Sequence, residues 1–361
     1  MTLVYSQANL TNDINRHLQG KQGMLVNIVD TANEAVRTVL SEVDLRTTRR
    51  KASLSPNLFN GIFDYACPSD LKANGIIDIP QQATRADGEF NLVPSREFET
   101  NKKTGDISID DYNGTRVLKI NSRVDSKSVV IAELDSLTSS GTWSAFGDAE
   151  TLAADTDDFI KGNGSLKFNI SSAAGTTAGI VNSTLNNVDL TDYLGGNGAV
   201  FVWAKINSTT GLTNFILRLG SSASNYYSKT VTTQSDGTAF VNGWNLLRFN
   251  LSSLTTTGTP VDASVVYSAL YMTKLTTKVS ESDYKFDWLV LKDGRNADVK
   301  YYSKFGFQTS GGTYIENSTT STDYVVADTD EYDLIVKKGI AIGTRELDFP
   351  RDVKDEKDND Y

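Results

Sequence analysis

Cysteine and histidine are almost absent from this sequence. The 361 residues include one cysteine, Cys67, and one histidine, His17. An intrachain disulfide and a metal site built from several histidines or cysteines are therefore excluded. No G-x-S-x-G motif accompanies the single histidine, which argues against a serine–histidine–aspartate triad. We expect that the protein is not an enzyme; the enzymatic alternative is a pair of facing carboxylates of the glycosidase type.

Long apolar runs and an excess of positive charge are also missing. No stretch approaches the roughly 20 apolar residues that span a bilayer, so we expect no membrane association. The opening MTLVYSQANLTND lacks a basic segment followed by an apolar one, and we expect no signal peptide. The net charge of −10 argues against a dedicated nucleic-acid-binding protein.

The first fifty residues have the apolar spacing of helices. Leu10, Ile14 and Leu18 recur every four residues, and Asn27 is positioned as the N-cap of a second helix with Asp30 in its first turn. The apolar positions of that second helix follow the i, i+3, i+4, i+7 pattern of one buried face: Val29, Ala32, Val36, Val39, Leu40 and Val43. We therefore predict a helical N-terminal part.

Short strands follow the helices. FDYACPSDLKANGIIDI, residues 63–79, reads as a strand, a turn and a second strand. ISIDDYNGTRVLKINS contains Asn113-Gly114, a strong hairpin signal between two alternating runs. After Arg295, a strand, a turn at Gly311-Gly312 and a further strand precede a helix. Asp328 and Glu331 have the spacing of a capping box for that helix.

The middle of the chain differs in composition. Residues 133–295 are rich in Ser, Thr, Asn and Gly, and short β-runs such as AVFVWAKI and WNLLRFNL alternate with turn-forming residues. This pattern predicts a β-sandwich of the jelly-roll type. We predict an α+β fold in which residues 1–132 and 296–361 form a discontinuous base domain. The all-β jelly roll, residues 133–295, is inserted into it.

The base domain resembles a known family. DLRTTRRKASLSPNLFNGIFDYACPSDLKANGIIDI, the later VKYYSKFGF and the helix after DTDEYDL are similar to the head-to-tail connector adaptors (tail accessory factors) of tailed bacteriophages. The resemblance covers about 200 residues. It implies a ring of usually about twelve copies beneath the portal. It also implies contact with portal, tail and neck proteins, with packaged DNA lying in the channel. The protein would be made in the host bacterial cytoplasm and reside in the virion.

The sandwich has a resemblance of its own. GWNLLRFNLSSL and YKFDWLVLKDG are similar to the last strands of carbohydrate-binding jelly rolls. That resemblance implies a structural Ca²⁺ held in part by Asp135 and Asp287, although calcium requires six to eight oxygens. We expect Tyr226 and Tyr227 to be exposed for stacking on a glycan. The four tryptophans are expected in the core, with sugar stacking as the alternative: Trp143, Trp203, Trp244 and Trp288.

A basic cluster follows the second helix. Arg46, Arg49, Arg50 and Lys51 have two interpretations: a solvated helix end, or an assembly contact with an acidic neighbour.

Two functions follow from the sequence as a whole. The first is a structural virion protein, a head-to-tail connector with a projecting jelly roll. The alternative is a phage adhesin or fibre-like protein whose jelly roll binds host surface glycans.

Overall fold

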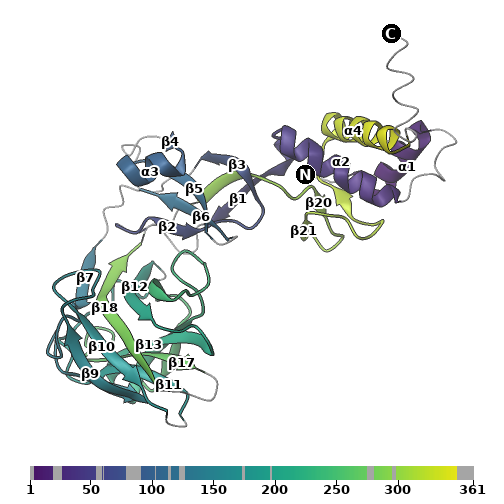
Figure 1. The fold of residues 1–361 in the computed structure, drawn as a ribbon. Coiled ribbons are helices and arrows are strands. Elements are labelled where there is room, and N and C mark those ends of the chain that lie inside the picture. The colour runs from purple at the N-terminus through teal and green to yellow at the C-terminus, as the bar shows by residue number, and fades with distance from the viewer. Residues whose placement is uncertain are drawn as a thin grey trace. The chain divides into compact units, whose positions relative to one another are not determined.

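The structure is a computed structural model that describes most of the chain. The described residues are 4–18, 27–53, 59, 61–78, 91–101, 103–112, 115–121, 127–172, 175–195, 197–274, 280–294 and 298–347. They are mostly β-strand, as Figure 1 shows. The chain divides into two compact units. Unit 1 comprises residues 1–52, 68–79 and 299–361, and unit 2 comprises residues 53–67 and 80–298.

Unit 1 is built from both ends of the chain. Its central sheet has the order β1-β19-β3, and a smaller sheet has the order β21-β20-β22. Its elements are α1 (Gln7–His17), α2 (Ile28–Glu42), the 3₁₀ turn η2 (Arg46–Thr48), β1 (Arg49–Ser53), β3 (Leu71–Asp78), β19 (Asp298–Ser303), β20 (Phe307–Gln308), β21 (Tyr314–Ile315), β22 (Tyr324–Val325) and α4 (Thr329–Leu347).

Local side-chain chemistry explains where the helices of unit 1 begin. The Asn27 side chain accepts a hydrogen bond from the Val29 N–H and caps α2, as predicted. The predicted capping box of α4 is also confirmed. The Glu331 N–H donates to the Asp328 carboxylate at 3.0 Å, and the Asp328 N–H donates to the Glu331 carboxylate at 3.1 Å. Two otherwise unsatisfied backbone N–H groups are thereby paired.

Three helices form the core of unit 1. α4 packs against α1 and α2 (Figure 1), and Leu10, Ile14 and Val36 are fully buried between them. The helices approach closely at Gly339, where a Cβ would lie 2.4 Å from Ile14 Cδ1. The predicted apolar face of α2 is largely confirmed. Val43, however, is 42% exposed, because α2 ends at Glu42.

Unit 2 begins with a small sheet of order β2-β6-β5-β4. Its elements are β2 (Asp64–Ala66), β4 (Asn91–Leu92), α3 (Ser95–Asn101), β5 (Asp106–Tyr112) and β6 (Thr115–Ile120). β5 and β6 pair as an antiparallel hairpin, while its predicted turn, Asn113-Gly114, lies outside the described residues. Tyr65 on β2 is buried, and its hydroxyl donates to the Ile62 carbonyl at 2.9 Å.

The rest of unit 2 is a sandwich of two antiparallel sheets. We call the sheet of order β15-β12-β18-β10-β9, with β7 also paired to β18, sheet F, and the sheet of order β16-β14-β13-β17-β11-β8 sheet G. Their strands are β7 (Ser128–Ala132), β8 (Trp143–Gly147), β9 (Ala149–Asp155), β10 (Ser165–Ile170), β11 (Thr177–Asn182), β12 (Gly198–Ile206), β13 (Leu212–Ser222), β14 (Asn225–Val231), β15 (Gly243–Asn250), β16 (Thr255–Thr257), β17 (Tyr267–Lys274) and β18 (Glu281–Asp293).

One apolar core joins the two sheets. Phe286 of sheet F packs against Phe168 in a tilted arrangement with ring centroids 5.3 Å apart, and it meets Phe215 of sheet G edge to face with centroids 6.1 Å apart. The chain crosses repeatedly between the sheets, for example from β10 to β11 and from β11 to β12, as in a jelly roll. The sequence alternation along each strand therefore sends one set of side chains into this core and the other set outward.

The predicted strand, turn and second strand of residues 63–79 are present, but the sequence did not indicate their partners: β2 pairs with β6 and β3 pairs with β19. The boundaries also differ from those predicted. Residues 53–67 and 80–132 belong to the unit that contains the sandwich, and β7 is already a strand of sheet F. The alternation of apolar and polar residues predicted the strands, but the pairing of β2 and β3 depends on strands more than 50 positions away in the sequence.

Candidate functional site

The outward surface of sheet G carries a group of aromatic side chains around one arginine. We call it the tyrosine face, defined by Phe146, Arg218, Tyr226, Tyr267 and Tyr271. These residues come from four strands, β8, β13, β14 and β17, and lie at positions opposite to those that enter the sandwich core. Figure 1 shows β13, β17 and β11 beside one another in this sheet. Four separate strands therefore contribute to one surface.

Two glycines allow the aromatic rings to pack this way. Gly179 lies opposite Tyr271, and Gly220 lies opposite Tyr226. A Cβ on Gly220 would lie 2.6 Å from the Tyr226 Cβ, and one on Gly179 would lie 2.6 Å from the Tyr271 Cβ. Both separations are shorter than real Cβ contacts. The absence of a side chain at these two positions therefore leaves room for the tyrosines.

Arg218 is held between two rings. Its guanidinium carbon lies 4.7 Å from the ring centroid of Tyr226 and 5.0 Å from that of Tyr271, which is cation–π distance. Phe146 packs on Tyr271 with centroids 4.7 Å apart. Tyr267 and Tyr271 are nearly buried by these contacts, whereas Phe146, Arg218 and Tyr226 are half-buried. The solvent-facing part of the surface is therefore formed by an arginine and two aromatic rings.

Unsatisfied polar groups lie on the same strand as this arginine. The Arg218 Nε and the Asn214 Oδ1 are buried and have no hydrogen-bond partner. Buried polar atoms without partners are rare in proteins, and each one requires an explanation. Burial also raises the pKa of the Tyr271 hydroxyl above its ordinary value. Polar groups are thus packed among the aromatic rings of this surface.

The structure separates the two tyrosines that the sequence predicted as a pair. Tyr226 lies on the tyrosine face, as expected for a glycan contact. Tyr227 does not, and the expectation of an exposed ring is wrong for it. Because neighbouring residues of a strand face opposite sides, Tyr227 packs against the sandwich core. Its hydroxyl donates to Asp262 at 2.6 Å, and this bond raises the pKa of Tyr227 to about 12.

The tryptophans divide in the same way. Trp143 is buried in the core of the sandwich, as predicted. Trp203, Trp244 and Trp288 are only half-buried and lie outside that core, so the prediction of a core position is wrong for these three. Trp203 occupies the outward set of β12, since Val202 and Ala204 on either side face inward. Because side chains alternate along a strand, the sequence could have shown that Trp203 faces the side opposite to Val202 and Ala204.

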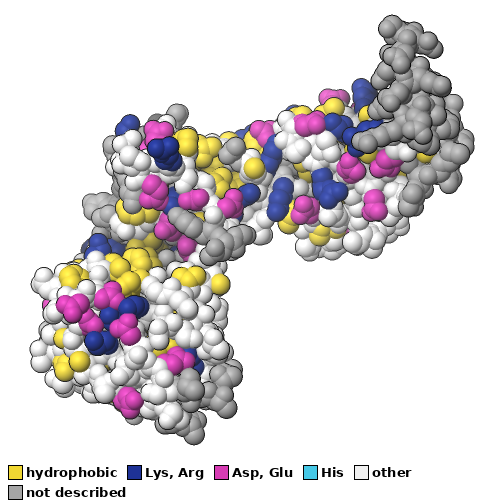
Figure 2. Space-filling view, in the orientation of Figure 1, with side chains coloured by type: hydrophobic (Ala, Val, Ile, Leu, Met, Phe, Trp, Pro, Cys, Tyr) yellow, Lys and Arg dark blue, Asp and Glu magenta, His cyan; other side chains and the backbone are white. Residues whose placement is uncertain are grey.

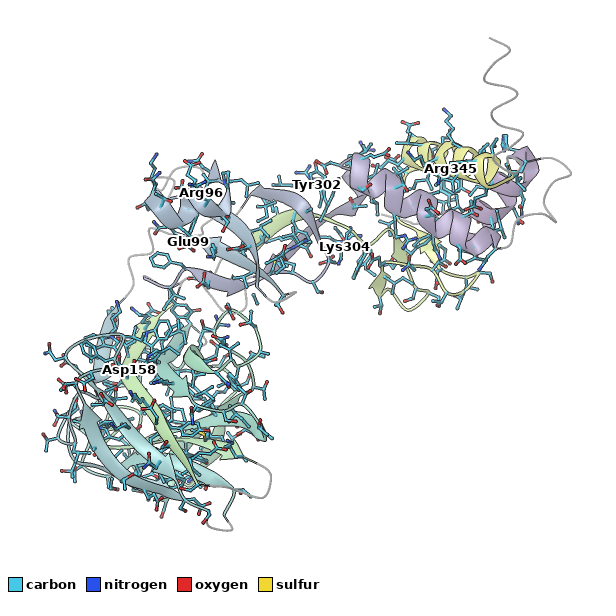
Figure 3. The ribbon with its side chains drawn as sticks, viewed as in Figure 1. Arg96, Glu99, Asp158, Tyr302, Lys304 and Arg345 are labelled. Carbon is cyan, nitrogen blue, oxygen red and sulfur yellow. The ribbon has the colours of Figure 1, made fainter. Side chains whose placement is uncertain are left out.

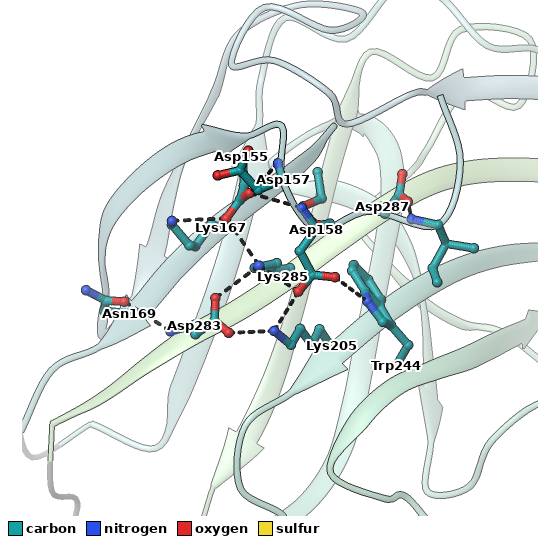
Figure 4. A network of polar contacts seen from close by, with 12 residues as sticks. Asp155, Asp157, Asp158, Lys167, Asn169, Lys205, Trp244, Asp283, Lys285 and Asp287 are labelled. Atoms are coloured by element: carbon teal, nitrogen blue, oxygen red, sulfur yellow. Dashed lines mark hydrogen bonds and ion pairs between the residues drawn. The ribbon is translucent and has the colours of Figure 1, made fainter. Parts of the chain in front are cut away.

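The outward surface of sheet F carries a network of acidic and basic side chains (Figure 4). Lys285, whose side chain is 4% exposed, lies 2.8 Å from Asp158 and 3.1 Å from both Asp155 and Asp283. Lys205 lies 2.6 Å from Asp158 and from Asp283. Figure 2 shows that the visible surface of the sandwich is otherwise largely uncharged. This network was not predicted from the sequence.

The network keeps its carboxylates ionised. Burial by itself raises the pKa of Asp158, labelled in Figure 3, but hydrogen bonds from Lys205, Lys285 and Trp244 outweigh burial and lower it well below its usual range. The N–H of Asp157 and the ammonium of Lys167 lower the pKa of Asp155 likewise. A general acid in catalysis needs a raised pKa, so these carboxylates are suited to holding lysines in place.

The two predicted calcium ligands lie near one another. Asp287 is fully buried, and its Oδ2 accepts hydrogen bonds from the N–H groups of Ile160 and Lys161 at 2.6 and 2.8 Å. Its Oδ1 is buried without a partner. Burial, together with the nearby Asp135 carboxylate, raises the pKa of Asp287 to about 6. An orphaned carboxylate oxygen beside a second carboxylate is an arrangement that a cation would stabilise.

A complete set of acidic ligands is not present at that place. Within the described ranges, no group of three His, Cys, Asp or Glu residues could hold a metal ion. Calcium takes six to eight oxygens, so backbone carbonyls and water would have to supply most of them.

The predicted basic cluster is not at a helix end. Arg46 lies in η2, and Arg49, Arg50 and Lys51 lie in β1. Arg46 pairs with Asp328 at 2.5 Å, and this contact raises the pKa of Arg46. The Arg50 guanidinium stacks on Tyr314 at 3.8 Å and donates to the Thr47 carbonyl. Arg46 and Arg50 therefore have contacts within unit 1, and Arg49 is exposed.

Comparisons with known proteins give a limited picture. No family model and no curated protein matches the chain. Among solved structures, a family 30 carbohydrate-binding module of a Clostridium thermocellum cellulase matches with 15% identity and a TM-score of 0.30, covering 47% of this chain and 96% of that one. A xylan-binding domain of family 22 matches with 21% identity and a TM-score of 0.25, covering 42% and 86%.

Enzymes are also found among the similar structures. An arabinose-bound α-L-arabinofuranosidase matches with 14% identity and a TM-score of 0.30. The match covers 45% of this chain but only 27% of the enzyme.

Among the residues that the structure describes, no helix is both long and apolar enough to cross a lipid bilayer.

Proposed function

We propose that unit 2 is a glycan-binding module and that the tyrosine face binds the sugar. The observation that carries this proposal is the half-buried Arg218 guanidinium, which lies over the rings of Tyr226 and Tyr271 on the outward surface of sheet G. A sugar ring has apolar faces and a rim of hydroxyl groups. Aromatic rings accommodate the faces, while the guanidinium of an arginine is a hydrogen-bond donor that suits the hydroxyls.

The surroundings favour an uncharged, extended ligand. Ser144, Ser228 and Thr255 lie in the same cross-sheet row as Arg218, as shown by the pairing of β8, β11, β17, β13, β14 and β16. Hydroxyl side chains thus flank the aromatic centre on both sides. A row of hydroxyls on either side of stacked rings fits a chain of several sugars better than a single small molecule.

Replacing Tyr226 with alanine should abolish most of this binding. Loss of a central aromatic contact costs on the order of 2 kcal/mol, which is about 30-fold in the dissociation constant. Affinity electrophoresis against neutral glucans, xylans and mannans would identify the ligand, and calorimetry would compare the variants. Tyr324→Ala, which removes an exposed tyrosine of unit 1, is the matched control. Unchanged binding by Tyr226→Ala, or no retardation by any neutral polysaccharide, would contradict the proposal.

The resemblance to connector adaptors supports a second candidate function for unit 1, as a subunit of a virion neck ring. Its support in the structure is surface composition. Arg49 is exposed on β1, and Leu334 on α4 and Val43 after α2 are 40% and 42% exposed. Exposed apolar and arginine side chains are typical of protein interfaces. Under this proposal the glycan-binding unit would be carried on a phage particle, as an adhesin is.

Reversing one charge should test that assembly. Arg49→Glu should prevent oligomer formation while leaving the folded subunit nearly as stable, because exposed charges contribute little to folding. Arg50 is unsuitable for this test, since it stacks on Tyr314. Mass photometry over a range of concentrations would report the oligomer, with Arg16→Glu on α1 as control. A wild-type protein that stays monomeric throughout, or an Arg49→Glu variant that assembles normally, would contradict a role for this residue.

We also propose that a calcium ion occupies the space beside Asp287 and Asp135 and stabilises unit 2. A ligand that binds only the folded state adds about 2.7 kcal/mol when it is present at a hundredfold excess over its dissociation constant. Chelation should therefore lower the melting temperature of the wild type. The variant Asp287→Asn should show no response to chelator or to added calcium. A wild type that contains no metal by elemental analysis and melts identically with chelator would remove the proposal.

A further inference from the structure

A separate cleft lies on the outward side of sheet F. Its volume is about 450 Å³, which is within the range of about 300–1,000 Å³ found for ligand pockets. It lies on the sheet that does not carry the tyrosine face. Its lining is mainly aromatic and aliphatic and includes Phe201, Trp203 and Trp288. Three charged residues also line it, namely Asp64, Lys161 and Lys292.

Two tryptophans supply flat walls to this cleft. Trp203 points outward from β12, and Trp288 lies at an irregularity where β18 shifts its register against β12. The backbone of Trp288 has φ of +56°, a conformation that bulky side chains rarely adopt. Such strain persists only where the surrounding structure enforces it, and it is common at binding sites. Here the strained residue is one that lines the cleft.

One face of Trp288 is supported by the backbone. A Cβ at Gly162 would lie 3.4 Å from the six-membered part of the indole, so the Gly162 backbone packs directly against the ring. The loop that contains Gly162 is fixed by Asp287, which accepts hydrogen bonds from the N–H groups of Ile160 and Lys161. The ring is therefore held in a defined orientation before any ligand arrives.

Two lysines give the cleft a positive charge. Lys161 and Lys292 both line it, and within the described ranges neither has an acidic side chain within 4 Å of its ammonium group. The Lys292 ammonium donates only to the Ser128 hydroxyl, at 3.4 Å. Burial lowers the pKa of Lys292, and the positive charge of Lys161 lowers it further. Asp64 is the one acidic residue in the lining.

We propose that this cleft binds an acidic sugar residue, a hexuronate. Its pyranose ring would lie against Trp203 and Trp288, and its carboxylate would lie beside Lys161 and Lys292. A bound carboxylate relieves the repulsion between the two ammonium groups and gives each of them a partner. The two indole rings favour a cyclic ligand over a simple anion, because a pyranose ring can pack against their flat apolar surfaces. The inference concerns a second site and does not depend on glycan binding at the tyrosine face.

The test compares sugars that differ only in the carboxylate. Calorimetry and tryptophan fluorescence would follow binding of glucuronate and galacturonate, with glucose, galactose and acetate as controls. We expect both uronates to bind at least tenfold more tightly than the neutral sugars and acetate. Their affinity should fall as salt is raised, because the attraction is between charges. Equal binding of neutral sugars, equal binding of acetate, or binding of none of these ligands would each overturn the proposal.

Matched variants locate the site. Lys161→Met and Lys292→Met keep most of the side-chain length, and each should weaken uronate binding about tenfold or more. Lys127→Met is the control, because Lys127 is exposed and pairs with Asp192 away from the cleft lining. Tyr226→Ala should leave uronate binding unchanged, which separates this site from the tyrosine face. Loss of binding in Tyr226→Ala together with normal binding in both cleft variants would assign the uronate to the other face.

Discussion

Replacing Lys285 with methionine should destabilise unit 2 by about 3–5 kcal/mol. The side chain is buried and contacts Asp155, Asp158 and Asp283 within 3.1 Å. Removing one partner of a buried ion pair leaves uncompensated charge, which costs this amount. Here three carboxylates would remain, with Lys167 and Lys205 still beside them. Denaturant unfolding would measure the loss, with Lys127→Met as an exposed control.

The same variant should change the response to acid. In the wild type the pKa values of Asp155 and Asp158 lie below the value of 3.8 that an unperturbed aspartate has. Groups with a lowered pKa stabilise the fold fully above their unfolded value, and this contribution is lost as the pH falls through the folded value. Wild-type stability should therefore decline below about pH 4. In Lys285→Met, protonation relieves repulsion, so a decline equally steep would show that these contacts are not the cause.

Ile14→Ala should destabilise unit 1 by about 2–5 kcal/mol, the usual cost of truncating a buried isoleucine. Ile14 is fully buried, and it fills the space left by Gly339 on α4. The truncation removes the side-chain atoms that lie against the Gly339 backbone of α4 and leaves a cavity between α1 and α4. Asn12→Ala, exposed on the same helix, is the control for helix propensity.

Calorimetry distinguishes the two large effects. Ile14→Ala should lower the melting temperature of unit 1, whereas Lys285→Met should lower that of unit 2. If each variant shifted the whole unfolding transition by the same amount, the two units would unfold together. A small effect of Ile14→Ala, comparable to that of Asn12→Ala, would show that the contact between α1 and α4 contributes little.

Local features of this fold could be predicted from the sequence because their determinants are close together. The capping box of Asp328 and Glu331 spans four residues, and Asn27 caps α2 through a neighbour two positions away. The jelly-roll strands could be predicted from the alternation of apolar and polar residues, which shows which side chains of each strand share a face. The same two-residue period could have shown that Tyr226 and Tyr227 face opposite sides of the sheet.

Features that depend on distant pairing could not be predicted. Lys285 meets Asp158 across 127 positions, and no spacing in the sequence indicates this contact. The two strands within residues 63–79 were predicted, but their partners were not, since the partners of β2 and β3 lie in β6 and β19. The outward lysines of β10, β12 and β18 were the available signal. A charged residue at every second position of a strand indicates a polar surface, but it does not identify the partner.

The construction of unit 1 from both ends of the chain has a consequence for its synthesis. α1, α2 and β1 leave the ribosome well before β19 and α4, which cover them. About 250 residues intervene, which at about 5–20 residues per second corresponds to roughly 10–50 s. During this interval the apolar face of α2 lacks α4, while the sandwich can already fold. A chain that ended within this interval would then carry unit 2 without a complete unit 1, so any assembly through unit 1 selects chains that include α4.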